Sequence, residues 1–277
     1  MAKKRKNLLT YIGLSLFAFV MIYPLVWLVL AAFKDTQEIL TSDRLLPKTF
    51  KLNGFIEGWK GEGRPKFSVF IWNSMALTLP TVILTIISGV LVAYGFSRFS
   101  FKLRKPLFAI MIGTILLPNT VLLIPRYLIF RNLGQLDSYV PFWLTAAAGV
   151  PFFIFMFVQF FHGIPRSLDE SAYLDGCGSF RILWSILIPL LKPAIFSAAI
   201  FQFIWTWDDF FQSLIYISSV DKYPVTLGLR LSIDAMGIPP WNQIAAMSVV
   251  AILPSVIIFF AAQKYFVEGI ATSGLKN

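Results

Sequence analysis

The sequence predicts an all-α integral membrane protein with six transmembrane helices. Hydrophobic residues make up 57% of the 277 positions, and the mean hydropathy is +0.73. Only 14% of the residues are charged, whereas a soluble domain of this length normally carries about 25%. The formal net charge is +10, and the basic residues are gathered in short segments beside apolar runs. This placement is typical of membrane orientation, so we expect a lipid bilayer and no nucleic acid as partner.

The first apolar segment predicts a span at about 8–33. It is long enough to cross a hydrocarbon core of roughly 30 Å, whereas a signal peptide would have a much shorter apolar core. The four basic residues at 3–6 precede it and are expected to stay in the cytoplasm. The polar segment at 34–68 is too long for a simple turn, so we expect an external loop with room for a short helix or strand. Its seven basic residues oppose this placement, but five acids accompany them.

Short basic segments and prolines orient and delimit the later spans. Arg98 closes the second apolar segment, and the three basic residues in the next ten positions are a strong cytoplasmic mark. Pro118 and Pro125 interrupt the third apolar segment and are interpreted as architecture, because proline bends a helix and is widely tolerated in membrane spans. The predicted order continues with spans at about 70–96, 106–126, 140–161, 193–217 and 243–264, a cytoplasmic loop at 163–192 and a cytoplasmic tail at 265–277.

The most polar helical signal of the chain lies at 167–178. Ser167 followed by Glu170 is a capping box, so we expect a helix to begin at Ser167, and Gly176 is placed to end it about two turns later. A helix this short is marginal in water by itself. It is therefore expected to dock on another surface.

The side chains of this short helix favour a protein as that surface. Ser171 and Ala172 are expected to face outward, where their small size would let another protein approach closely. Asp169 lies at the positive helix N-terminus. Asp175 opposes the helix dipole at the other end, so we expect its carboxylate to accept hydrogen bonds from the backbone N–H groups of the turn at 176–178.

Asp208 and Asp209 fall within the fifth predicted span. A carboxylate there is costly unless it meets water, a partner or a polar cavity, which favours a functional role. The alternative is that the helix is short and the two acids cap its external end near the lipid headgroups. The sequence leaves both interpretations open.

The motifs of common enzymes are absent from the sequence. No G-x-x-x-x-G-K-[ST] segment occurs, so the chain is not expected to be an ATPase. No H-E-x-x-H segment or serine-centred elbow occurs either. Cys177 is the single cysteine, which excludes an intrachain disulfide and a cysteine-cluster metal site, and His162 is interpreted as an interfacial residue. We therefore expect no catalytic residue, no metal site and no cofactor in this chain.

Several residues of the polar loop resemble the EAA loop of bacterial ABC importer permeases, with the pattern E-A-A-x-x-D-G followed by I-x-L-P. They are Glu170-Ser171-Ala172, Asp175-Gly176, Ile188-Pro189-Leu190 and Pro193. Ser171 and Cys177 depart from the commonest form by small replacements. In that family the loop is the cytoplasmic coupling helix, which fits into a cleft of the ATPase subunit. The resemblance implies an ATPase-coupling set of Ser167, Leu168, Asp169, Glu170, Ser171, Ala172, Tyr173, Leu174, Asp175, Gly176, Cys177 and Gly178.

Further segments resemble the carbohydrate class of these permeases, the class of the maltose and glycerol-phosphate importers. They follow in order along nearly the whole chain: Trp72-Asn73-Ser74, residues 93–99, Ile124-Pro125-Arg126-Tyr127 with Leu133-Gly134, Trp207-Asp208-Asp209-Phe210 and residues 263–269. The segment at Trp207 is similar to a W-N-D-F pattern, with Asp where Asn is commoner. The resemblance implies a translocation path at Asn73, Trp207, Asp208 and Asp209.

The resemblance implies a type I ABC importer permease in a bacterial plasma membrane, with both termini cytoplasmic. The chain would be the smaller of two unlike permeases, and the pair would carry a disaccharide or oligosaccharide delivered by an extracellular solute-binding protein. A dimer of separate ATPase subunits would bind ATP and Mg²⁺. The main alternative is an ion-coupled secondary sugar carrier with Asp208 and Asp209 as its ion site, and a structural membrane scaffold is a third possibility.

Overall fold

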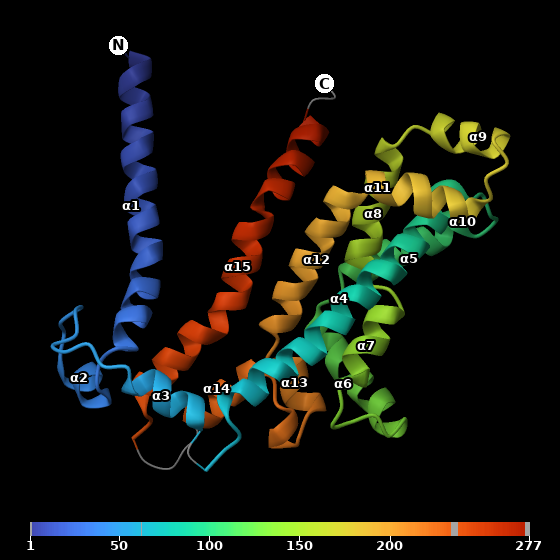
Figure 1. Cartoon of the computed structure of the whole chain (residues 1–277). Helices are drawn as coiled ribbons and strands as arrows, with labels where there is room; N and C mark the ends of the chain where they lie inside the picture. Colours follow the sequence, from blue (N-terminus) through green and yellow to red (C-terminus); the bar gives the residue numbers. More distant parts are fainter. Residues whose placement is uncertain (1, 62, 234–237, 275–277) are drawn as a thin grey trace. The chain divides into compact units, whose positions relative to one another are not determined.

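The computed structural model describes residues 2–61, 63–233 and 238–274, with side chains described between residues 10 and 261. Every regular element within these ranges is helical (Figure 1). The elements are α1 (Ala2–Ala31), α2 (Thr36–Thr41), α3 (Asn53–Lys60), α4 (Phe67–Arg98), α5 (Arg104–Ile115), α6 (Asn119–Asn132), α7 (Val140–Ala147), α8 (Pro151–Gly163), α9 (Ser167–Leu174), α10 (Ser179–Ile182), the π-helix η1 (Leu183–Leu187), α11 (Ile188–Leu190), α12 (Lys192–Trp207), α13 (Phe211–Tyr216), the 3₁₀-helix η2 (Val220–Lys222), α14 (Val225–Ile233) and α15 (Trp241–Gly274).

Four of the described helical segments are long and apolar enough to cross a membrane, at Thr10–Ala31, Phe67–Arg98, Val140–Gly163 and Trp241–Ala261. Two further pairs of helices pass the same test together, although each is sharply bent: α5 with α6 by 105°, and α10 to α11 with α12 by 76°. Each predicted span overlaps one of these segments or pairs, but the second bent pair begins at Ser179, within the predicted loop, and ends at Trp207, before the predicted end of the fifth span.

At two places an apolar run in the sequence does not form one continuous helix. Pro118 precedes α6 with φ −59° and ψ 132°, so the third span breaks there and does not continue as one helix. The fifth predicted span also breaks, because α12 ends at Trp207 and a separate helix begins at Phe211. Asp208 and Asp209 lie in this break, and not in the middle of a helix.

The described chain divides into two compact units, the first formed by residues 1–71 and 225–254, the second by 72–224 and 255–277. In the first unit, α3 packs its glycine face directly on backbone: a Cβ at Gly54 would lie 2.7 Å from the carbonyl oxygen of Asn242 and 2.9 Å from that of Ala32. The predicted external loop thus contains the helices α2 and α3, and α3 is anchored to the end of α1 and the start of α15.

The core of the second unit is built between α4, α8, α10, η1 and α12. Phe153, Phe157 and Phe161 of α8 are fully buried in it. A Cβ at Gly89 of α4 would lie 3.0 Å from the Phe157 ring, so this glycine lets α4 and α8 approach closely. The core also includes Ala172 of α9, which ties the polar loop to the spans.

Candidate functional site

Helix α9 begins at Ser167, as predicted, but the predicted capping box is wrong. Arg166 is the N-cap residue, and no side chain caps the helix. Ser167 is already helical, so its hydroxyl is one position too late to act as the cap. The first turn is instead closed by backbone, with the Glu170 N–H donating to the carbonyl oxygen of Arg166 at 3.1 Å.

The end of α9 is a Schellman motif centred on Gly176, which has φ +80°. The Cys177 N–H donates to the Ala172 carbonyl oxygen at 2.9 Å, and the Gly176 N–H donates to that of Tyr173 at 3.0 Å. Glycine therefore ends the helix as predicted. The role predicted for Asp175 is wrong, because these helix carbonyls, and not its carboxylate, accept from the two amides.

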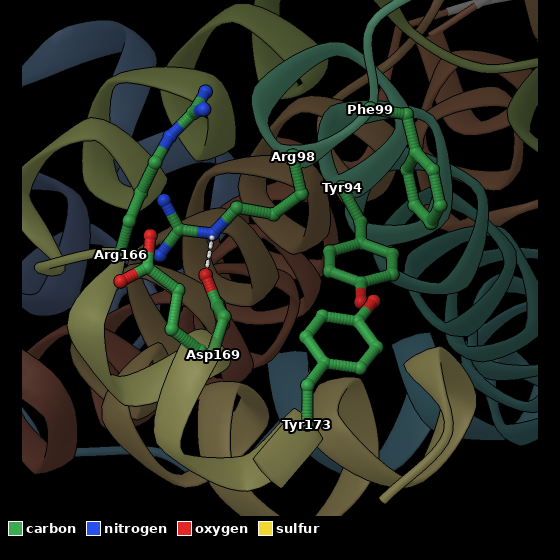
Figure 2. Close-up of a pocket in the computed structure, with 7 residues that line it drawn as sticks. Tyr94, Arg98, Phe99, Arg166, Asp169 and Tyr173 are labelled. Atoms are coloured by element: carbon green, nitrogen blue, oxygen red, sulfur yellow. Dashed lines mark ion pairs between the residues drawn. The ribbon is translucent and has the colours of Figure 1, made fainter.

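A buried ion pair holds α9 against the end of α4 (Figure 2). Arg98 Nε lies 2.7 Å from Asp169 Oδ2, and the two side chains are only 8% and 11% exposed. Burial raises the pKa of the Asp169 carboxyl, while the charges of Arg98 and Arg166 act in the opposite direction. The sequence placed Asp169 at a helix N-terminus but gave no sign of this partner, 71 positions earlier in the chain.

Two arginine–carbonyl bonds reinforce the ion pair. Arg98 Nη2 donates to the Ile164 carbonyl oxygen at 3.0 Å, and Arg166 Nη2 donates to that of Ser97 at 3.0 Å. The end of α4 and the residues that lead into α9 therefore each donate an arginine hydrogen bond to the backbone of the other.

Tyrosines on the two helices extend this contact to the start of α10. The Tyr94 hydroxyl donates to the Ser179 carbonyl oxygen at 3.0 Å, and the Tyr173 hydroxyl lies 2.8 Å from Ser179 Oγ. A cavity of about 180 Å³ remains between the helices (Figure 2). It is lined by Tyr94, Arg98, Phe99, Arg166, Asp169, Glu170 and Tyr173.

The outward face of the polar loop is apolar at several positions. Leu174 at the end of α9 is 90% exposed, and Phe180 and Trp184 on the next helices are 72% and 66% exposed. Ser171 is exposed as predicted, but the outward position predicted for Ala172 is wrong, because Ala172 is 5% exposed and packs in the core. Large exposed apolar side chains gathered on one loop are typical of a protein-binding surface.

The break between α12 and α13 places the predicted path residues in three different environments. Trp207 is buried and stacks on Phe203, with the two ring centroids 5.4 Å apart. Asp209 lies one residue before the N-cap Phe210 of α13, and its Oδ2 accepts from the Ser213 N–H in the first turn at 2.9 Å. Asp208 is exposed, and its carboxylate has no hydrogen-bond or ion-pair partner among the described residues.

Asn73 lies toward the other end of α4, where it binds the segment at 221–223 of the second unit. Its amide donates to the carbonyl oxygens of Asp221 at 2.7 Å and Tyr223 at 3.0 Å. The Asn73 side-chain N–H groups are therefore used within the chain.

Trp205 was missed in the sequence, although it shares a helix face with Asp208. It is 48% exposed. The centroid of its ring lies 5.2 Å from that of Phe152 and 6.1 Å from that of Phe201. Positions 201 and 205 of α12 are spaced i, i+4, and Asp208, the C-cap residue directly after the helix, continues the spacing at i+7. This spacing is the signal that could have identified Trp205.

Asp137 forms a clasp between the loop before α7 and the segment at 217–222. Its carboxylate accepts from the backbone N–H groups of Ser218 at 3.0 Å and Ser219 at 2.8 Å, from Ser219 Oγ at 2.7 Å and from Lys222 Nζ at 2.9 Å. These bonds hold the pKa of Asp137 far below its ordinary value, with Lys222 as the largest cause. Its backbone is left-handed, with φ +54°, which is unusual for a residue other than glycine.

Comparison with known proteins gives consistent findings over most of the chain. The family described as "Binding-protein-dependent transport system inner membrane component" matches residues 82–272. The probable ABC transporter permease protein YurM of Bacillus subtilis is 32% identical over 96% of this chain and 88% of its own length. The arabinooligosaccharides transport system permease protein AraQ of the same organism is 31% identical over 92% of this chain and 91% of its own length.

One solved structure is similar to nearly all of the chain. It is the crystal structure of a bacterial ABC transporter involved in the import of the acidic polysaccharide alginate. The TM-score is 0.86 at 22% sequence identity, and the match covers 96% of this chain and 98% of that chain. The likeness shows that the two chains share a fold.

Proposed function

The chain belongs to the family of binding-protein-dependent transport system inner membrane components, and we propose that it is one of two permease subunits of an ATP-driven oligosaccharide importer. It is a multi-pass membrane protein with the fold of an ABC importer permease. The proposal adds a cargo, partner subunits and an orientation with both termini in the cytoplasm.

The geometry of α9 is the observation that carries the proposal. This short helix leaves the membrane-spanning bundle between α8 and α12, is fixed on α4 by the buried Arg98–Asp169 pair, and exposes Leu174 almost completely. A fixed helix with an exposed apolar end is suited to insert into a cleft of another protein. We assign that cleft to an ATPase subunit, which would bind ATP and Mg²⁺ in place of this chain.

The proposed cargo is a disaccharide or oligosaccharide. Relatives such as AraQ are named for oligosaccharide transport, and α12 carries a stripe suited to a sugar. The exposed ring of Trp205 can stack on the apolar face of a sugar, and Asp208 can accept hydrogen bonds from its hydroxyl groups. A free carboxylate is costly against lipid, so this stripe is expected to line the path between the two permeases.

We place Asp208 and Trp205 in the translocation path, with Asp209 shaping the break and Trp207 supporting it from the core. Asn73 would act at the external end of the path, through the segment it binds. An extracellular solute-binding protein would deliver the sugar there. The chain itself would catalyse no reaction.

Co-purification from the native membrane tests this proposal. The chain is expected to carry an ATPase and a second permease with it in mild detergent, and the eluate is expected to hydrolyse ATP. Replacing Glu170 with Lys on the exposed face of α9 should abolish sugar uptake and leave the ATPase uncoupled or lost, while the spans still insert. A chain that elutes alone and takes up sugar with an ion gradient would contradict the proposal.

A further inference from the structure

The two ends of α4 contact two separate parts of the second unit. At the end nearest α9, Arg98 forms the ion pair with Asp169 and donates to the Ile164 carbonyl oxygen. At the other end, Asn73 donates to the carbonyl oxygens of Asp221 and Tyr223, in and directly after the segment at 217–222 that Asp137 binds. The helix is continuous between these contacts, although Pro80 lies inside it and leaves one backbone carbonyl without its helical partner. With a rise of 1.5 Å per residue, Asn73 and Arg98 are about 38 Å apart along its axis.

The ion pair is better suited to fix a position than to stabilise the fold. Removing two charges from water is costly, and a buried pair often gives little net stability compared with apolar residues of the same size. Asp169 Oδ1 is also buried without a hydrogen-bond partner among the described residues, so the site is not an optimised network. Arg98 Nε is likewise buried without a hydrogen-bond partner among the described residues, so the pair is a close contact of opposite charges that limits how α9 sits on α4.

The two ends of α9 are held by hydrogen bonds of Arg166 and Tyr173, and the middle of the helix by Asp169. The helix follows the extended residue Ile164 and ends at the left-handed Gly176. Its own buried residues are Asp169 and Ala172. Ala172 offers a small apolar contact, while Asp169 binds a specific atom of α4. A displacement of the exposed Leu174 end would therefore be transmitted to α4 by the Arg98–Asp169 pair and by the two arginine–carbonyl hydrogen bonds.

We propose that Arg98 and Asp169 are positioning residues that make α9 and α4 move as one body, so that α4 carries the ATPase-driven displacement to the segment at 217–224. The proposal rests on the proposed function, because it needs an ATPase at α9. It adds that the outer end of α4 moves the Asp137 clasp through Asn73. The force path thus follows one helix from the cytoplasmic face to the external face.

The test uses the complete importer in nanodiscs, with a reporter cysteine at Val220, which is 37% exposed beside the clasp. Labelling of this cysteine by a hydrophilic maleimide is measured with and without ATP plus vanadate, and labelling of the native Cys177 is subtracted using the chain without the reporter. The second readout is sugar transported per ATP hydrolysed. Assembly is measured as ATPase co-purified per permease.

Asp169→Asn is expected to retain the ATPase but to lose the nucleotide-dependent change in labelling, with transport per ATP reduced about tenfold. Asp43→Asn is the matched control, since Asp43 is an exposed carboxylate for which the described residues offer no partner, and it should match the parent. An assembled Asp169→Asn importer that keeps both readouts at parent values would overturn the proposal.

Arg98→Lys decides the matter if Asp169→Asn fails to assemble. Lysine keeps the charge but lacks the planar fork that reaches both Asp169 and the Ile164 carbonyl. Reduced transport per ATP in the assembled Arg98→Lys importer supports the proposal, and unchanged coupling with a normal labelling response refutes it. A parent chain that binds no ATPase would contradict the proposed function itself, which is a separate outcome.

Discussion

The Asp137 clasp offers a quantitative test, because one residue combines several hydrogen bonds with a left-handed backbone. Three variants separate these contributions. Asp137→Asn keeps one carbonyl acceptor and tolerates φ +54°, Asp137→Gly keeps only the backbone freedom, and Asp137→Ala keeps neither. The expected loss of stability therefore increases in the order Asn, Gly, Ala.

The magnitudes follow from the contacts. The bonds from two backbone N–H groups and one hydroxyl should contribute about 2 kcal/mol after allowance for partial exposure. The Lys222 pair should add no more than about 0.5 kcal/mol, since the two side chains are 49% and 28% exposed. Forcing alanine into the left-handed region costs about 1 kcal/mol more. We expect losses of about 1 kcal/mol for Asn, about 2.5 for Gly and about 3.5 for Ala.

Thermal unfolding of the purified chain in one detergent, at one scan rate, measures this series. At about 2–4 °C per kcal/mol, Asp137→Ala should lower the apparent Tm by at least about 7 °C. Because the folded pKa lies below the ordinary value of 3.8, the carboxylate stabilises the fold above that pH and loses this effect only as the pH falls through the folded pKa. The differences should therefore be constant between pH 5 and pH 8. A Gly variant as stable as the parent would show that the carboxylate contributes nothing.

Three other substitutions test separate parts of the structure. Gly228→Ala would place a Cβ 2.5 Å from the Phe70 ring and should destabilise the chain by about 1–3 kcal/mol, whereas Gly13→Ala, with no atom within 4 Å, should leave the apparent Tm unchanged. Trp205→Ala should raise the KM for sugar uptake by about fivefold or more with normal ATPase binding, and Trp205→Phe should recover most of it; equal KM values would remove Trp205 from the path. Leu174→Asp should release the ATPase during purification, because a carboxylate would be buried unpaired in the interface, while Leu174→Met should retain it.

The apolar segments and the ends of α9 could be predicted because their signals are local, whereas the breaks in the third and fifth predicted spans could not. Apolar length predicts a span, and a glycine that can adopt φ +80° predicts the end of a helix. The capping box failed because the true N-cap lies one residue earlier, at Arg166. The role of Asp175 failed for a similar reason, since helix carbonyls compete for the same amides.

The contacts that fix the candidate site could not be predicted, because they join residues far apart in the sequence. Nothing near Asp169 indicates that Arg98 is its partner, and nothing near Asn73 indicates that its amide binds the segment at Asp221 and Tyr223. The choice between Trp205 and Trp207 depends on which face of α12 packs in the core. An apolar helix with aromatic residues on all sides does not reveal that face without its neighbours.

Reconstituted transport is the most direct test of the central claim that this chain is a permease driven by a separate ATPase. The co-purified importer is placed in proteoliposomes with the loaded solute-binding protein outside and ATP inside, and labelled oligosaccharide uptake is followed with and without an ionophore. We expect uptake that requires ATP and the binding protein, persists with the ionophore and disappears in Glu170→Lys. Uptake by this chain alone that needs no ATP and collapses with the ionophore would contradict the claim and favour an ion-coupled carrier acting through Asp208 and Asp209.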